Sequence, residues 1–75
     1  MGRILPLGMA MDDAKELGLA IRNARREAGI TQADLADLAG IGVRTVRSIE
    51  AGAGNPSLTA VVNAANAVGL SVKAT

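Results

Sequence analysis

Glycines divide this chain into short segments, and within each segment the apolar residues recur three and four positions apart. This spacing is typical of amphipathic helices, and a glycine directly after a helix supplies the left-handed residue that ends it. Helices are therefore expected over about residues 13–28, 32–39, 43–51 and 58–68. The glycines that end them are Gly29, Gly40, Gly52 and Gly69. In a chain of 75 residues this pattern predicts one all-helical domain at residues 12–69, after a tail at 1–11 and before a short strand at 70–75.

The faces expected to form the core consist of aliphatic residues, because the chain has no Phe, Trp or Tyr. From the first helix to the last, these positions are Ala14, Leu17, Ile21, Ala24, Ala28, Leu35, Leu38, Ala39, Val46, Ile49, Leu58, Val61, Val62, Ala65 and Val68. A domain of this size buries only about 60% of its unfolded surface, so its stability is expected to be marginal. Association with a second copy is the usual supplement when a small chain has no disulfide or metal.

The chain also has no Cys and no His, which removes several classes of function. Disulfides, thiolate or imidazole metal sites, and Ser-His or Cys-His nucleophile pairs are excluded. The apolar run at residues 4–11 is too short, and too broken by Pro6, for a signal peptide or a membrane span. We therefore expect a cytoplasmic protein that is not an enzyme and has no metal, cofactor, small-molecule ligand or membrane contact.

Two features of the C-terminal part predict contact with a second copy. Residues 70–75 alternate between apolar and polar, as a short strand does, and the strand's mate would be either residues 4–7 or another copy of the chain. Pairing between copies is the preferred interpretation, because an unpaired strand exposes its backbone groups. The fourth helix also carries a flat stripe of small residues beside its core face. The residues expected at this dimer interface are Ala60, Ala64, Ala67, Leu70, Val72 and Ala74.

The second and third helices are separated by three residues, Gly40 to Gly42, which is the connection length of a helix-turn-helix. If Val46 and Ile49 point inward, Arg44, Arg47 and Ser48 share the outer face of the third helix. Arg and Ser are side chains that read base edges in the major groove of DNA, although an ordinary solvated surface would look the same. Residues 22–47 hold five arginines and three acidic residues, a net charge of +2, so the positive charge gathers here.

The sequence IRNARREAGITQADLA at residues 21–36, with AGI at 39–41 and TVRSIEAG at 45–52, resembles the phage repressor/Cro (Xre) helix-turn-helix family. NPSL at residues 55–58 and AVGL at 67–70 extend the resemblance, which covers about residues 14–70. The resemblance implies a lambda-repressor-like fold of four to five helices. It also implies a nucleoid-associated repressor that binds double-stranded DNA at a palindromic operator.

Within this family, the closing strand and the short C-terminal end look most like the HipB-type antitoxins. By that resemblance, the strand pairs across a homodimer, the dimer represses its own operon, and it binds a HipA-type kinase toxin. Two other functions stay open. One is a stand-alone phage-type or restriction-control regulator, and the other is a module whose main role is to bind a partner protein.

The resemblance also assigns functions to individual positions. The residues at base-reading positions are Val43, Arg44, Arg47 and Ser48. The residues at phosphate-binding positions are Thr31, Gln32 and Thr45, to which the exposed face of the first helix adds Arg22 and Arg26. Arg25 and Glu50 match a structural ion pair between the first helix and the end of the third. Gly42 departs from the family's usual Ser or Thr cap, and Val43 could contact a thymine methyl group or simply pack.

Overall fold

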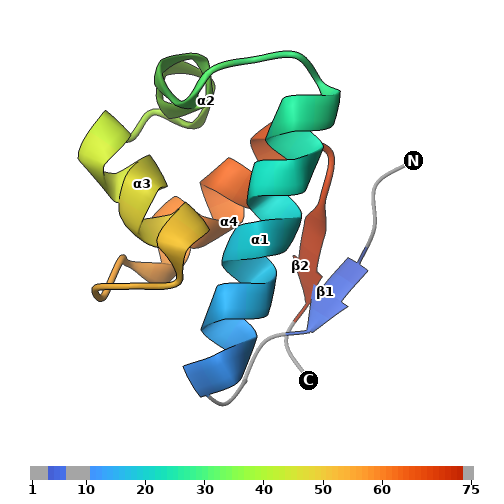
Figure 1. The fold of residues 1–75 in the computed structure, drawn as a ribbon, viewed down its shortest axis with the longest axis vertical. Helices are drawn as coiled ribbons and strands as arrows, with labels where there is room; N and C mark the ends of the chain where they lie inside the picture. The colour runs from blue at the N-terminus through green and yellow to red at the C-terminus, as the bar shows by residue number, and fades with distance from the viewer. Residues whose placement is uncertain (1–3, 7–10, 74–75) are drawn as a thin grey trace.

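The computed structural model describes residues 4–6 and 11–73. Four helices and two short strands follow one another along these residues (Figure 1). In chain order they are β1 (Ile4–Pro6), α1 (Met11–Glu27), α2 (Gln32–Ala39), α3 (Val43–Ala51), α4 (Leu58–Ala67) and β2 (Ser71–Lys73). The predicted all-helical class is confirmed, with a two-stranded sheet added at one side.

Local chemistry sets the ends of α2. The Thr31 hydroxyl accepts a hydrogen bond from the Asp34 backbone N–H at 3.0 Å, and the Asp34 carboxylate accepts one from the Thr31 N–H at 2.9 Å. This capping box satisfies two donors that a helix start otherwise leaves free. At the other end, Gly40 adopts a left-handed conformation (φ 68°), as predicted. The helix therefore has the length that its sequence encodes.

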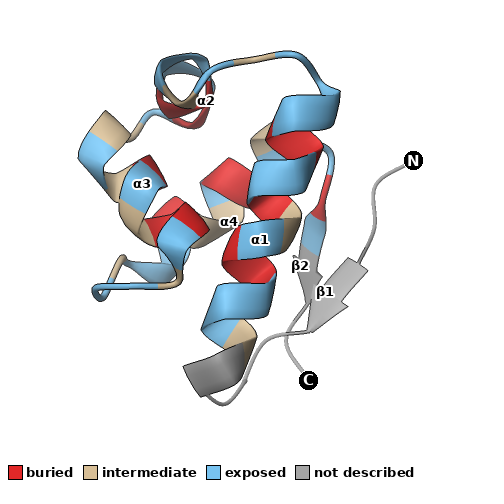
Figure 2. Cartoon of the chain, viewed as in Figure 1, coloured by how far each residue is buried: buried red, intermediate tan, exposed pale blue. Residues whose placement is uncertain are grey.

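The core lies between the four helices and is filled by aliphatic side chains (Figure 2). The buried members are Leu17, Ile21, Ala24, Leu35, Ala36, Ala39, Val46, Ile49, Ala60, Ala64, Ala65 and Leu70. Several predicted core positions are wrong, because Ala14 and Ala28 are exposed and the side chains of Leu38 and Leu58 are 65% and 60% exposed. Val61, Val62 and Val68 are only half-buried.

The orientation of α4 explains why part of the predicted dimer surface is also wrong. This helix packs against α2, and Ala60 and Ala64 lie inside the chain's own core. Small side chains let packed helices approach closely. Leu70 is likewise buried in the same chain, and Ala67 packs half-buried against the core. These residues are therefore core contacts of a single copy.

The predicted strand forms at Ser71–Lys73 and pairs with β1 of the same chain, which is the first of the two mates considered from the sequence. The two strands are parallel, with Ile4 opposite Ser71, Leu5 opposite Val72 and Pro6 opposite Lys73. Pairing within one chain avoids the entropy lost when two molecules associate, which favours this arrangement. The predicted tail thus contributes a strand, and Ala74 lies outside the described residues.

Candidate nucleic-acid interface

The outer face of α3 is produced by the way its inner face is anchored. Val46 and Ile49 are buried against α1 and α2, and Ile41 packs against the core from the turn between α2 and α3. Because this inner pair is fixed, Arg44 and Arg47 point away from the core and are exposed. The three-residue connection and the outward arginines form the predicted helix-turn-helix arrangement.

The other two predicted base-reading residues are less accessible. Ser48 is half-buried on the same side of α3 as the arginines. Val43 is half-buried and packs against the core, which favours the packing alternative for this residue. Gly42, which precedes it, caps α3 without any side-chain hydrogen bond, in agreement with the missing Ser or Thr cap.

A shallow hollow of about 220 Å³ lies beside this face and includes a residue that was not predicted from the sequence, Asn55. Arg44, Thr45, Ser48, Asn55 and Pro56 line it. Asn55 is exposed, and its amide can both donate and accept hydrogen bonds, so it is a further candidate for contact with DNA. The Gly-Asn-Pro turn before α4 is visible in the sequence. Its closeness to Arg44 in the fold could not be predicted, because the two lie apart along the chain.

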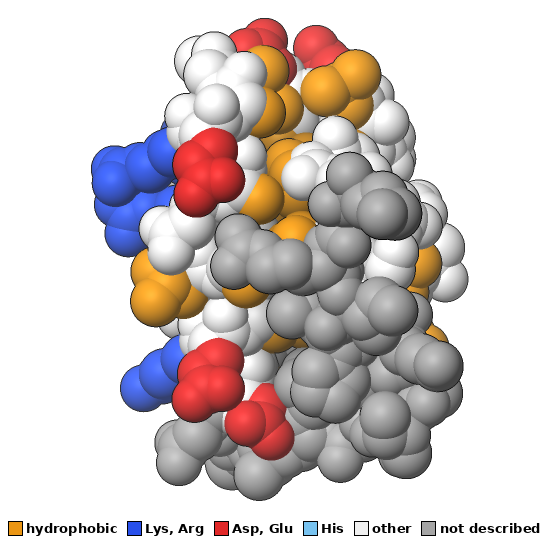
Figure 3. All heavy atoms as spheres, turned by 90° about the vertical axis from the view of Figure 1, so that its right-hand side faces the viewer, with side chains coloured by type: hydrophobic (Ala, Val, Ile, Leu, Met, Phe, Trp, Pro, Cys, Tyr) orange, Lys and Arg blue, Asp and Glu red, His pale blue; other side chains and the backbone are white. Residues whose placement is uncertain are grey.

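A second hollow, which we call the basic hollow, lies where α1, α2 and α3 meet and measures about 370 Å³. Its lining residues are Arg22, Arg25, Arg26, Gln32, Arg47, Glu50 and Ala51. Three of its four arginines, at positions 22, 26 and 47, are exposed, whereas its one carboxylate is buried and paired. On the face drawn in Figure 3, Lys and Arg side chains lie along one edge, with Asp and Glu side chains beside them. The basic hollow therefore offers uncompensated positive charge to an anion such as a DNA phosphate.

The predicted ion pair between Arg25 and Glu50 is confirmed. Arg25 Nε donates to Glu50 Oε2 at 2.7 Å and Nη2 donates to Oε1 at 3.1 Å, with both side chains buried. The hydrogen bond to Glu50 raises the pKa of Arg25 above its ordinary value. Arg25 Nη1 also donates to the carbonyl of Ile30 at 2.9 Å. The pair thus holds α1, α3 and the loop before α2 in one arrangement.

The predicted phosphate-binding residues are divided between the two hollows and the start of α2. Arg22, Arg26 and Gln32 meet in the basic hollow, and Thr45 lies beside Arg44 in the smaller hollow. Thr31 is exposed at the start of α2, where its hydroxyl oxygen is occupied as a cap acceptor and its hydroxyl proton can still be donated. The structure therefore groups three of the predicted phosphate contacts in the basic hollow and one in the smaller hollow, with Thr31 in neither.

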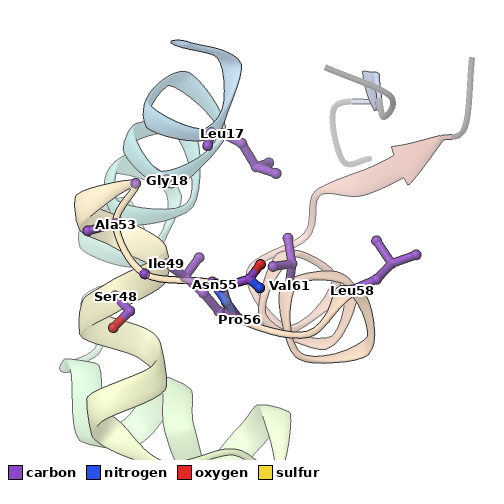
Figure 4. A pocket seen from close by; sticks show the side chains of 12 residues that line it. Leu17, Gly18, Ser48, Ile49, Ala53, Asn55, Pro56, Leu58 and Val61 are labelled. Atoms are coloured by element: carbon purple, nitrogen blue, oxygen red, sulfur yellow. The ribbon is translucent and has the colours of Figure 1, made fainter. Parts of the chain in front are cut away.

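A third pocket, of about 300 Å³, lies between α1, α4 and the loop after α3 (Figure 4). Leu17, Ile49, Leu58 and Val61 give it an apolar character, and no charged side chain lines it. Its lining comes from three segments that meet only in the folded chain, so the sequence could not predict it. It shares Ser48, Asn55 and Pro56 with the smaller hollow and no residue with the basic hollow. Among the described residues, no group of three acidic side chains could hold a metal ion.

Comparison with known proteins agrees with this geometry. The family model for helix-turn-helix proteins matches residues 21–73, which is more than half of the chain. The chain belongs to the helix-turn-helix family, in its Cro/C1-type (Xre-like) branch. A similar solved structure is that of the restriction-modification controller protein C.AhdI from Aeromonas hydrophila. The similarity has a TM-score of 0.70 and 30% sequence identity, and it covers 79% of this chain and 89% of the controller.

None of the curated protein sequences compared matches the chain. Family membership and the outward arginines of α3 together identify this helix-turn-helix protein as a DNA-binding transcriptional regulator. Among the described residues, no helix has the length and apolar character needed to cross a membrane.

Proposed function

We propose that the protein is a sequence-specific repressor that controls its own operon as a stand-alone regulator. The observation that carries this proposal is the exposure of Arg44 and Arg47 on one face of α3, between two hollows that hold the other polar candidates. With α3 in the major groove, each arginine can donate two hydrogen bonds to a guanine. Arg22 and Arg26 would then face the phosphates beside the groove.

Repression by this domain requires two copies on one operator. A single chain carries a net charge of only +1, so its non-specific attraction to DNA is weak. A homodimer would present two α3 helices to half-sites about 34 Å apart and double the number of contacts. A dimer bound over a promoter excludes polymerase by its bulk. The outer face of α3, with Arg44 and Arg47, is complete within one chain.

The antitoxin function has less support than the stand-alone one. It rested on a C-terminal strand shared between two copies, and β2 already has a partner strand, β1, within its own chain. The solved structure similar to this chain is a restriction-modification controller, which favours a regulator of that kind. Co-expression with the product of the adjacent reading frame separates the two functions. Equimolar co-purification of a kinase-type partner would replace our proposal with the antitoxin function.

The DNA-binding part of the proposal is tested by fluorescence anisotropy on duplexes from the chain's own promoter and on scrambled duplexes. Arg44→Ala and Arg47→Ala should each weaken promoter binding by at least about 1 kcal/mol and lower the preference for promoter over scrambled DNA. Arg22→Ala should weaken binding to both duplexes alike and reduce the salt dependence by about one phosphate contact.

Lys15→Ala is the matched control, because Lys15 is an exposed cation on α1 that lines neither hollow. It removes the same charge and should change promoter preference little. If both α3 variants retain the wild-type preference for the promoter, the assignment of α3 as the reading helix is wrong.

A further inference from the structure

The side-chain amide of Gln32 lies between a buried carboxylate and an exposed arginine. Gln32 Nε2 donates to Glu50 Oε1 at 3.2 Å, and Gln32 Oε1 accepts from Arg47 Nε at 3.4 Å. Gln32 is the first residue of α2, whereas Glu50 and Arg47 are one turn apart on α3. The amide therefore bridges the two helices of the helix-turn-helix.

Glu50 determines which way the Gln32 amide points. A carboxylate accepts hydrogen bonds and has no proton to donate, so the NH₂ group of Gln32 must face it. Glu50 is itself held in place by two hydrogen bonds from Arg25. The carbonyl oxygen of Gln32 is consequently directed away from Glu50 and toward Arg47. The flipped amide is excluded, because it would turn the carbonyl oxygen of Gln32 toward the carboxylate of Glu50.

The bond from Gln32 restricts Arg47 without using the groups that bind DNA. Only Nε of Arg47 is occupied, and among the described residues no hydrogen bond engages its Nη1 or Nη2. Because the guanidinium is planar, holding Nε limits the direction in which the two Nη groups point. An exposed arginine without such a contact samples many rotamers and loses that freedom when it binds.

We propose that Gln32 is a positioning residue that sets the sequence specificity of Arg47, and that Glu50 orients Gln32 for this task. The inference rests on the proposed function, in which Arg47 reads bases. It differs from the phosphate contact that the family resemblance assigns to Gln32. A phosphate contact adds affinity for any DNA, whereas positioning acts only through Arg47 and changes the preference among sequences.

Two variants of Gln32 separate these possibilities. Gln32→Met keeps the length of the side chain and removes both hydrogen bonds. Gln32→Lys keeps a donor for Glu50 but offers no acceptor to Arg47, so the buried carboxylate stays paired and the fold is protected. Both variants are measured by anisotropy on promoter and scrambled duplexes, alone and combined with Arg47→Ala. The combination with Arg44→Ala is the matched control, since Arg44 makes no hydrogen bond with Gln32 in the structure.

We expect replacement of Gln32 to affect promoter preference only when Arg47 is present. Gln32→Met should lower the promoter preference about two- to tenfold in the wild-type and Arg44→Ala backgrounds, and change it little in the Arg47→Ala background. Gln32→Lys should lower the promoter preference in the same way while raising affinity for scrambled DNA through its added charge. An equal loss in all three backgrounds would overturn positioning and indicate a direct phosphate contact.

An NMR measurement on the free protein tests, without DNA, whether Gln32 positions Arg47. Relaxation of the Arg47 ¹⁵Nε–H group should show a more ordered side chain in the wild type than in Gln32→Lys, while that of Arg44 stays unchanged. If Arg47 is equally mobile in both proteins, Gln32 does not position it. If Arg47 is ordered by Gln32 but Arg47→Ala leaves promoter preference intact, the proposed base-reading function of Arg47 fails and the role of Gln32 in specificity fails with it.

Discussion

Arg25 of α1 and Glu50 of α3 form a two-pronged ion pair inside the protein, with side chains 11% and 3% exposed. A buried charge is stabilised only while its partner is present, because water cannot solvate it. The pair also anchors the backbone at Ile30 and orients Gln32, so it connects the packing of the helices to the face proposed to bind DNA.

Removing one partner of this pair should therefore destabilise the fold strongly. Glu50→Met or Arg25→Met is expected to lower the free energy of unfolding by about 3 kcal/mol, because the remaining group loses its buried counterpart. The double variant Arg25→Met/Glu50→Met should lose less than the sum of the single changes. Urea denaturation measures all three, with the exposed Arg22→Met as control. Additive losses in the double variant would contradict this account of the pair.

Gly18 lies where α1 crosses the end of α3, and a side chain there has no room. A Cβ atom on Gly18 would collide with the carbonyl oxygen of Ile49 and lie 3.0 Å from that of Glu50. Gly18→Ala should reduce the free energy of unfolding by about 2 kcal/mol, although Ala is the better helix former by about 1 kcal/mol. Thermal denaturation followed by circular dichroism tests this. Asn23→Ala, at an exposed position of the same helix, should leave stability equal or slightly higher.

The helix ends could be predicted because they depend on local chemistry. Thr31 and Asp34 form a capping box at a fixed spacing, and Gly40 and Gly52 end helices in the left-handed conformation that glycine adopts without strain. The outward direction of Arg44 and Arg47 followed in the same way from the helical period. These features need no information about the rest of the fold.

The helical period predicted most of the buried core positions. It did not predict the burial of Ala60 and Ala64, which depends on how closely the helices approach. Hydrophobicity alone ranks Leu58 above Ala60, yet Leu58 is exposed and Ala60 is buried. The bridge from Gln32 to Glu50 and Arg47 joins residues 18 and 15 positions apart. No local pattern marks such a contact, and the family resemblance assigned Gln32 to a phosphate instead.

The start of α3 offers a stabilising substitution. Gly42 has extended backbone angles (φ −79°, ψ 154°), makes no side-chain cap, and has open space where a Cβ would lie. Gly42→Ser should accept a hydrogen bond from an N–H of the first turn and raise the free energy of unfolding by about 0.3 kcal/mol. Gly40→Ser is the matched control and should be destabilising, because Gly40 has a positive φ of 68°. A Gly42→Ser variant less stable than wild type would show that Gly42 is not the N-cap of α3.

Asp34 should make the stability of α2 depend on pH. Its pKa is lowered from the ordinary value, chiefly because its carboxylate accepts a hydrogen bond from the backbone N–H of Thr31. A carboxylate with a lower pKa in the folded state stabilises the fold above its unfolded pKa, about 4, and this contribution disappears as the pH falls through the folded pKa. The stability difference between wild type and Asp34→Asn should accordingly be largest near neutral pH and shrink below about pH 4. Urea denaturation over this pH range measures it, with Asp37→Asn as control.

Asp37 lies near the C-terminal end of α2, where a negative charge is unfavourable, so its replacement should not destabilise the protein at neutral pH. A difference for Asp34→Asn that grows as the pH falls would contradict the capping box.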